Sequence, residues 1–336
     1  MINAREVKLP TFMRRTPTKM LAHWLALILF AASGAIAGSG SPVREAARSL
    51  IAERVDADRA ANGLPPLTFA PELNEALDAW CEQQIREGTV GHFSLDGFPP
   101  YARYSAIGVA DAVLENAVAW SANYSFEGAA ILDLARRSQD AMMAERPPRD
   151  SHRKTILDPH ATHLGVGIAW VRGEFRLVQL VLRKNVEWAT TPAPAARAGE
   201  RSSVTGTARE GWDVVAATLH WQELPRSLSA AAANRIESYD LPAPHRRWAA
   251  QPHPTRRDSG TGEGLARFAG AMRGDGGLTV DAGGKFVFRG SFDNGPGIYT
   301  LVVWLREPRS GEAVASSHIS TVVGAGSSAN PAGAGR

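Results

Sequence analysis

The spacing of the hydrophobic residues changes near residue 190, and this change most constrains what the chain can fold into. Before it, apolar residues recur at the three- and four-residue intervals of helices; after it, they alternate with polar or small residues, as strands require. Val215, Ala217, Leu219 and Trp221 show the second pattern clearly. A chain of 336 residues is also too long for one small domain. We therefore expect two domains of different class.

Three helices are predicted in the first half. The first lies within residues 43–64, because Asn62-Gly63 and then Pro65-Pro66 follow its apolar stripe. The second opens at Pro71 and ends at Gly88, and the third runs over 127–143. Two strands follow, at 165–170 and 176–183. Helices followed by strands predict a layered α/β or α+β domain.

The second half is predicted to be an antiparallel β-sandwich. A stretch rich in Pro, Ala, Arg and Gly, 191–201, has the composition of a linker. Alternating segments near 215–221, 286–292 and 299–305 follow, and turn residues separate the last two. The basic segment 241–264 is interpreted as a solvated loop, with contact to an acidic polymer as the alternative. The Gly/Ala/Ser tail from Gly324 should be disordered.

Composition excludes several classes of protein. Hydrophobic residues make up 44% and charged residues 21%, which is enough for an ordered core. The net charge is only +3, so nucleic acid is not expected as the main partner. Cys81 is the single cysteine, which excludes an intrachain disulfide and a cysteine zinc site. Because Cys81 lies on an apolar helix stripe, we expect it in the core rather than in catalysis.

Residues 1–37 have the order of a secretory signal peptide. Basic residues, Arg14, Arg15 and Lys19, precede an apolar run over 20–32, and Ala35-Ile36-Ala37 follows as a small-x-small cleavage pattern. Either Met1 or Met13 can be the true start. The run is too short for a membrane anchor, and no later stretch predicts a membrane span. We therefore expect a protein that is secreted or held in the cell envelope.

Three local clusters of polar residues in the first half carry potential chemistry. They are Gly91-His92-Phe93-Ser94-Leu95-Asp96-Gly97, followed by Arg103; Leu114-Glu115-Asn116-Ala117-Val118; and Glu145 to Leu157 with His152, running into His163-Leu164-Gly165-Val166-Gly167. Each is weak alone. A histidine after a helix is often structural, Glu115 can cap a helix, and Ser151 can be the N-cap of a helix that contains His152.

Together, and in this order, the clusters resemble the CAP superfamily: the cysteine-rich secretory proteins, antigen 5 and pathogenesis-related 1 proteins, also called the SCP domain. The likeness covers about residues 44–188. The segment from Arg59 to Leu67 is similar to the end of the first helix in bacterial members. His92 with Ser94, Asp96 and Gly97 is similar to their first histidine motif, and Glu115-Asn116 to the Gly-Glu-Asn motif with Leu114 in place of glycine. Ser151-His152-Arg153 and Leu164 to Gly167 are similar to the second histidine motif and the strand after it.

The resemblance implies an α-β-α sandwich with a central cleft in which His92, Glu115 and His152 meet. It also implies a second acidic residue upstream of the second histidine, for which Glu145 is the candidate, with Asp150 behind it. The expected organisation is then a signal peptide at 1–37, a CAP domain at 43–190, a linker at 191–203, a β-sandwich at 204–323 and a tail at 324–336.

Three functions fit these residues. The first is a binding module whose cleft holds a lipid, a polysaccharide or another cell-wall component. The second is a metal-assisted hydrolase or peptidase, with Zn²⁺ on His92 and His152 and Glu115 as general base. The third is a purely structural envelope protein. No nucleophile elbow and no His-Glu-x-x-His helix occurs, which favours binding. The basic segment with His245 and His253 is a rival metal site.

We predict that export removes residues 1–37, because the apolar run is too short and is interrupted by His23. N-terminal sequencing of the exported protein should therefore start at Gly38. Membrane-bound protein that begins at Met1 or Met13 would contradict this prediction.

Overall fold

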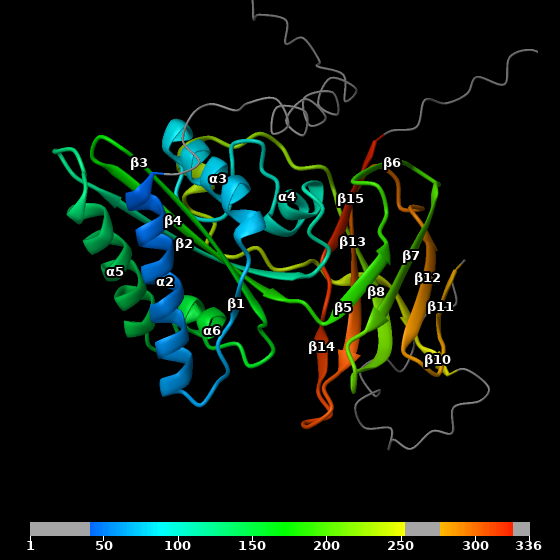
Figure 1. Cartoon of the computed structure of the whole chain (residues 1–336). Coiled ribbons are helices and arrows are strands. Elements are labelled where there is room, and N and C mark those ends of the chain that lie inside the picture. Colours follow the sequence, from blue (N-terminus) through cyan, green and yellow to red (C-terminus); the bar gives the residue numbers. More distant parts are fainter. Residues whose placement is uncertain (1–40, 253–275, 325–336) are drawn as a thin grey trace, which may run out of the picture.

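The computed structural model describes residues 41–252 and 276–324. The predicted signal peptide, His253 and the tail after Gly324 lie outside these residues. The described chain forms a helical α+β domain followed by a domain of sheets, which lie side by side in Figure 1.

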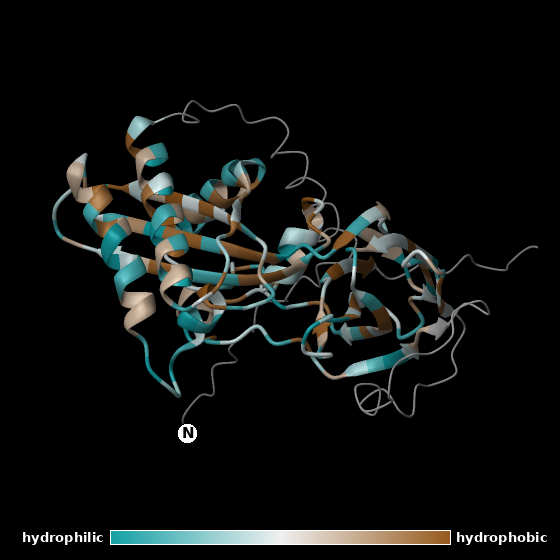
Figure 2. Ribbon diagram, turned by 60° about the horizontal axis from the view of Figure 1, so that its bottom comes forward, coloured by the Kyte–Doolittle hydropathy of each residue, from teal (hydrophilic) through white to brown (hydrophobic). Residues whose placement is uncertain are grey.

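A four-stranded sheet with helices on both faces forms the first domain. The strand order is β1 (Thr68–Phe69), β3 (His163–Val171), β4 (Glu174–Arg183) and β2 (Ala112–Ser121), so β2 is an edge strand. On one face α2 (Pro42–Ala61), α5 (Ala129–Ala144) and α6 (Ser151–Ile156) share a core with the sheet. A one-turn 3-10 helix at Pro71–Leu73, α3 (Asn74–Glu87) and α4 (Pro100–Ala106) cover the other face. Hydrophobic colours run along the strands between these layers in Figure 2.

The predicted helices and strands of this domain agree with the structure, and Cys81 is fully buried in the core as expected. Three elements were missed, and one of them is the two-residue strand β1. The helix α4 is short, and β2 carries the polar pair Glu115-Asn116 inside an apolar run, which breaks the alternation that marks a strand. The expected N-cap, Ser151, is instead the first residue of α6, and Asp150 holds the N-cap position.

Two sheets that share one apolar core make up the second domain. The first sheet contains β10 (Gln251–Pro252), β11 (Gly277–Val280), β12 (Lys285–Ser291), β7 (Arg201–Ala208) and β5 (Val186–Thr190) in this order. The second contains β6 (Ala195–Arg197), β15 (Ile319–Gly324), β13 (Gly297–Arg306), β8 (Asp213–Gln222) and β9 (Pro244–Ala249), with β14 (Ala313–Ala315) paired to β13. A helical turn, α7 (Ala230–Ala233), lies between β8 and β9.

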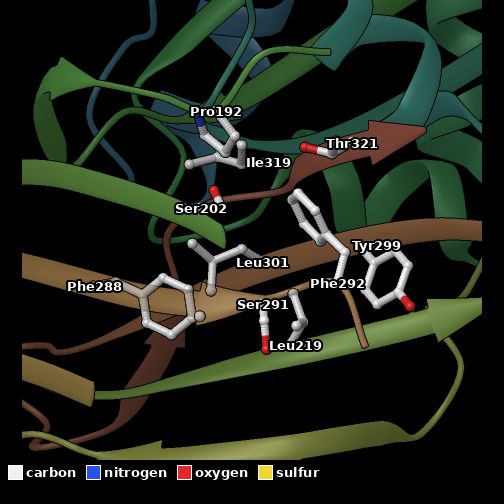
Figure 3. A pocket seen from close by; sticks show the side chains of 11 residues that line it. Pro192, Ser202, Leu219, Phe288, Ser291, Phe292, Tyr299, Leu301, Ile319 and Thr321 are labelled. Carbon is white, nitrogen blue, oxygen red and sulfur yellow. The ribbon is translucent and has the colours of Figure 1, made fainter. Parts of the chain in front are cut away.

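Apolar side chains fill the core between the two sheets of the second domain. Figure 3 shows a small hollow there, surrounded by apolar side chains that include Leu219, Phe288, Phe292 and Tyr299. Its volume is about 10 Å³, which is about the space of a single water molecule. This hollow is therefore too small for a ligand larger than water.

The segment expected to be a linker is structured. It contains β6, which pairs with β15, and the first residues of β7, while β5 from the end of the expected CAP region pairs with β7. The composition suggested a linker, but Ala196 packs against the apolar core. Residues 244–249 of the expected basic loop likewise form β9, which pairs with β8 and buries Trp248.

The two domains also share a core. Ile298 and Val322 of the second domain are buried in the same cluster as Trp80, Tyr101 and Tyr104 of the first. Polar contacts cross the boundary as well: Trp188 donates to Asp111 at 3.1 Å, and the Val113 amide donates to His318 Nδ1 at 3.2 Å. The second domain is therefore packed directly against the α3–α4 layer.

We predict that Gly167→Ala lowers the free energy of unfolding by about 1–3 kcal/mol, because overpacking would push α3 away from the sheet. A Cβ at Gly167 would lie 2.5 Å from backbone atoms of Leu77. Gly165→Ala is the matched control and should cost less, since its nearest contact is the end of the Leu77 side chain. Urea unfolding of both variants measures the difference, and equal losses would contradict this account.

Candidate functional site

Strand β2 places two consecutive polar side chains on opposite faces of the sheet. Residues alternate in facing along a strand, so Glu115 faces the α3–α4 layer together with Val113. Asn116 faces the α2–α5–α6 layer together with Leu114. The two halves of the expected cleft are therefore built on the two sides of this edge strand.

A fully buried carboxylate, that of Glu115, organises the first half. Its Oε1 lies 2.9 Å from His92 Nδ1, and its Oε2 accepts hydrogen bonds from Arg103 Nη2 at 2.6 Å and from the Tyr104 hydroxyl. Arg103 also stacks on the Trp80 ring, 3.7 Å from its centroid, and donates to the His92 carbonyl. Three donors thus surround one carboxylate with no exposed surface.

Electrostatics keep Glu115 ionised in this setting. Burial by itself would raise the pKa of Glu115, but Arg103, His92 and Tyr104 together hold it below its usual value. Burial and the neighbouring Glu115 raise the pKa of the Tyr104 hydroxyl well above its usual range, so Tyr104 remains a donor. Glu115 is therefore the anion of a buried ion pair rather than a carboxylate held ready to take up a proton.

The second half of the expected cleft consists of His152 and Glu145. Their side chains are each about one-quarter exposed, and Glu145 Oε1 is hydrogen-bonded to His152 Nδ1. Glu145 Oε2 accepts from the His152 backbone amide at 3.0 Å and from the Arg153 amide at 3.4 Å. Glu145 therefore also caps the start of α6, where amides have no partner within the helix.

Two buried polar side chains fix α6 against the rest of the domain. Asn116 Nδ2 donates to the His152 carbonyl oxygen at 3.2 Å. Arg59, which has no exposed surface, donates to the carbonyl oxygens of Ile156 and Asp158 at 2.8 and 2.9 Å. The bonds from Arg59 use carbonyl groups at and beyond the end of α6, where the helix offers no partner. With the Asn116 bond they hold α6, and therefore His152, in position.

The four candidate residues form two His–Glu pairs, His92 with Glu115 and His152 with Glu145. Glu115 and Asn116 point to opposite layers, and Asn116 binds the His152 carbonyl oxygen. That His92, Glu115 and His152 share one cleft stays a prediction. Sequence analysis noted Arg103 without a role and missed Tyr104. Nothing in the sequence links the second domain to Glu115, although Tyr239 also contacts this residue.

The side chains around His92 and His152 do not form the expected zinc site in the described structure. Within the described residues, no three His, Cys, Asp or Glu side chains are grouped so that they could hold a metal ion. The Glu115 carboxylate is already bound by the Arg103 cation, and His152 has one carboxylate partner, Glu145. The rival His245 lies on β9 with its ring edge against Tyr299, and neither of its nitrogens has a hydrogen-bond partner in the described structure.

A shallow groove of about 400 Å³ opens beside α6. Its lining combines apolar and charged side chains: Leu114, Asp150, Arg153, Lys154, Thr155, Leu157, Asp158, Pro159 and Arg183. Two of the cations are neutralised by neighbours, Arg183 by Asp158 at 2.7 Å and Lys154 by Asp150 at 2.8 Å. Arg153 instead donates to the Met143 carbonyl and to Asn62, so it keeps its net charge.

Comparison with known proteins agrees with this architecture. Residues 52–180, which make up most of the first domain, match the model of the cysteine-rich secretory protein family, CAP. The match ends within β4, so the second domain lies outside it. No protein with a curated description matches the chain.

Similarity to solved structures is weaker. The crystal structure of hookworm platelet inhibitor is 12% identical, with a TM-score of 0.26, and the match covers 40% of this chain and 67% of that one. At that level the likeness does not bear on function. In the described residues, no helix is both long enough and apolar enough to cross a membrane.

We predict that Glu115→Gln lowers the free energy of unfolding by about 3–5 kcal/mol at pH 7, because it leaves the Arg103 charge buried without its partner. Since the pKa of Glu115 is lowered in the folded state, its contribution is present above about pH 4.5 and is lost as the pH falls below that value. The difference from wild type should therefore shrink in acid.

Glu145→Gln is the control for this prediction. Its pair with His152 is partly exposed, and the amide oxygen can still cap α6, so the loss should be below about 1 kcal/mol. Urea unfolding at pH 7 and pH 4 compares both variants. Equal losses for the two would contradict the central role assigned to Glu115.

Proposed function

We propose that this CAP-domain protein acts outside the cytoplasm as a binding protein, with the groove beside α6 as its ligand site and the second domain as an appended β-sandwich. One observation carries the proposal: the polar residues expected to be catalytic are already used in structural contacts, while the groove next to them is open. Glu115 is saturated by three donors, and Glu145 caps a helix.

The alternative of a metal-assisted hydrolase has less support. A general base needs a carboxylate or imidazole within reach of a water or a substrate, and Glu115 is enclosed by its partners. Each described pair presents one imidazole and one carboxylate, and the Glu115 carboxylate already binds Arg103.

The groove itself favours a ligand of mixed polarity. Leu114, Leu157 and Pro159 provide apolar surface, and Arg153 provides a cation that no acidic side chain neutralises in the described structure. Such a lining suits an amphipathic molecule with an anionic group. A lipid or a cell-wall glycan of the envelope has this character, and the signal sequence predicts that the protein reaches it.

We predict that the exported protein binds vesicles containing phosphatidylglycerol or purified peptidoglycan, and that Thr155→Trp weakens this binding about tenfold by filling the groove. Thr279→Trp is the matched control, because Thr279 is an exposed threonine on β11 of the second domain. Cosedimentation measures both variants. Unchanged binding by Thr155→Trp, or no binding by wild type to either material, would contradict the groove as the site.

A further inference from the structure

A long segment of the second domain crosses over the loop that carries His92. This segment, residues 223–243, connects β8 to β9, and we call it the strap (yellow-green in Figure 1). The Leu228 amide donates to the Leu95 carbonyl at 2.7 Å. Asn234 accepts from the Val90 amide at 2.7 Å and donates to the Gly88 carbonyl at 3.1 Å. The strap is thus attached along the whole loop between α3 and α4.

Gly97 shows how closely the strap approaches. A Cβ at this position would lie 2.7 Å from the carbonyl oxygen of Arg226, which is too close for a real contact. Gly97 also has a positive φ of 79°. Glycine is therefore required here both by its own backbone and by the strap lying against it.

Tyr239 of the strap occupies a slot between His92 and the free edge of β2. Its hydroxyl accepts from the Glu115 backbone amide at 2.6 Å and donates to the Glu115 carbonyl, with 3.3 Å between the oxygens. Its ring packs edge-on against His92, with 4.6 Å between ring centroids. Burial raises the pKa of Tyr239 above its usual range, so the phenol keeps the proton that it donates. One hydroxyl thus satisfies both a donor and an acceptor.

The strap is held by its hydrogen bonds and by a few side chains. Ala233 is buried, and Leu224, Tyr239 and Leu241 are partly buried against the core cluster of the α3–α4 layer. The other strap residues are half-buried or exposed. Connections longer than about 12–15 residues are uncommon unless they have a function, and segments with few buried contacts open at low free-energy cost.

We propose that the strap is a latch that closes a second binding site beside His92, and that the slot filled by Tyr239 takes a hydroxyl group carried on a planar ring. When the strap lifts, the slot presents the Glu115 amide and carbonyl together with the His92 imidazole. A phenol-like ligand can then make the bonds that Tyr239 makes. The α6 groove lies on the other side of β2, so this proposal does not depend on the proposed function.

The test measures how fast diethyl pyrocarbonate modifies His92 in the full chain, with peptide mass spectrometry as the readout. Wild type should react slowly, and Tyr239→Ala should react about tenfold faster, because both the latch and the ring over His92 are removed. Asn234→Ala should also react faster, since it loosens the strap without emptying the slot. Glu237→Gln, an exposed strap residue, is the matched control and should behave as wild type.

Chemical rescue tests the slot. In Tyr239→Ala, added p-cresol should slow the modification of His92, and toluene, which lacks the hydroxyl, should slow it less. The modification rate of His152 should not change in any variant. His92 that reacts equally fast in wild type, Tyr239→Ala and Asn234→Ala would overturn the latch. Equal effects of p-cresol and toluene would overturn the hydroxyl slot.

Discussion

The buried carboxylate of Glu115 connects more parts of this molecule than any other side chain described above. It joins β2 to α4 through Arg103 and Tyr104, and to the loop after α3 through His92. A buried charge is costly to leave unpaired, so these partners cannot be removed one at a time without a large loss of stability. The backbone of the same residue receives Tyr239 from the second domain. Glu115 is therefore a position of the edge strand β2 at which the second domain contacts the first.

The two histidines each lie in a His–Glu pair of their own. His92 belongs to the buried ion pair. His152 lies at the start of α6, where the Glu145 carboxylate binds both the His152 ring and the His152 backbone amide. The polar character of both positions is explained by structural bonds. The groove beside α6, by contrast, is open to solvent.

Sequence analysis predicted most of the fold because the periodicity of its helices and strands is strong. It gave α2, α3, α5, β3 and β4, and the alternating strands of the second domain, close to their observed ranges. It missed β2 because Glu115 and Asn116 interrupt the apolar pattern, and both of these side chains are buried against partners far away in sequence. The linker was misjudged because short strands such as β6 are stabilised by pairing with β15, which local composition does not reveal.

The candidate site was predictable only in part, for a related reason. The motifs identified His92, Glu115, Glu145 and His152, and each does lie in a His–Glu pair. The partners of Glu115 and Asn116 depend on the face of β2 to which each side chain points. Because β2 was not predicted, the sequence analysis could not assign these faces. Tyr239 could not be found at all, since its partner lies 124 residues earlier in the chain.

The position of Tyr239 has a consequence for how molecules of this protein meet one another. An edge strand with unpaired amides and carbonyls is a template on which another chain can add a strand. Because the Tyr239 hydroxyl binds the Glu115 amide and carbonyl, it removes one such position from the outer edge of β2. A side chain from the second domain thus occupies an edge position with which a strand of another chain would otherwise be able to pair.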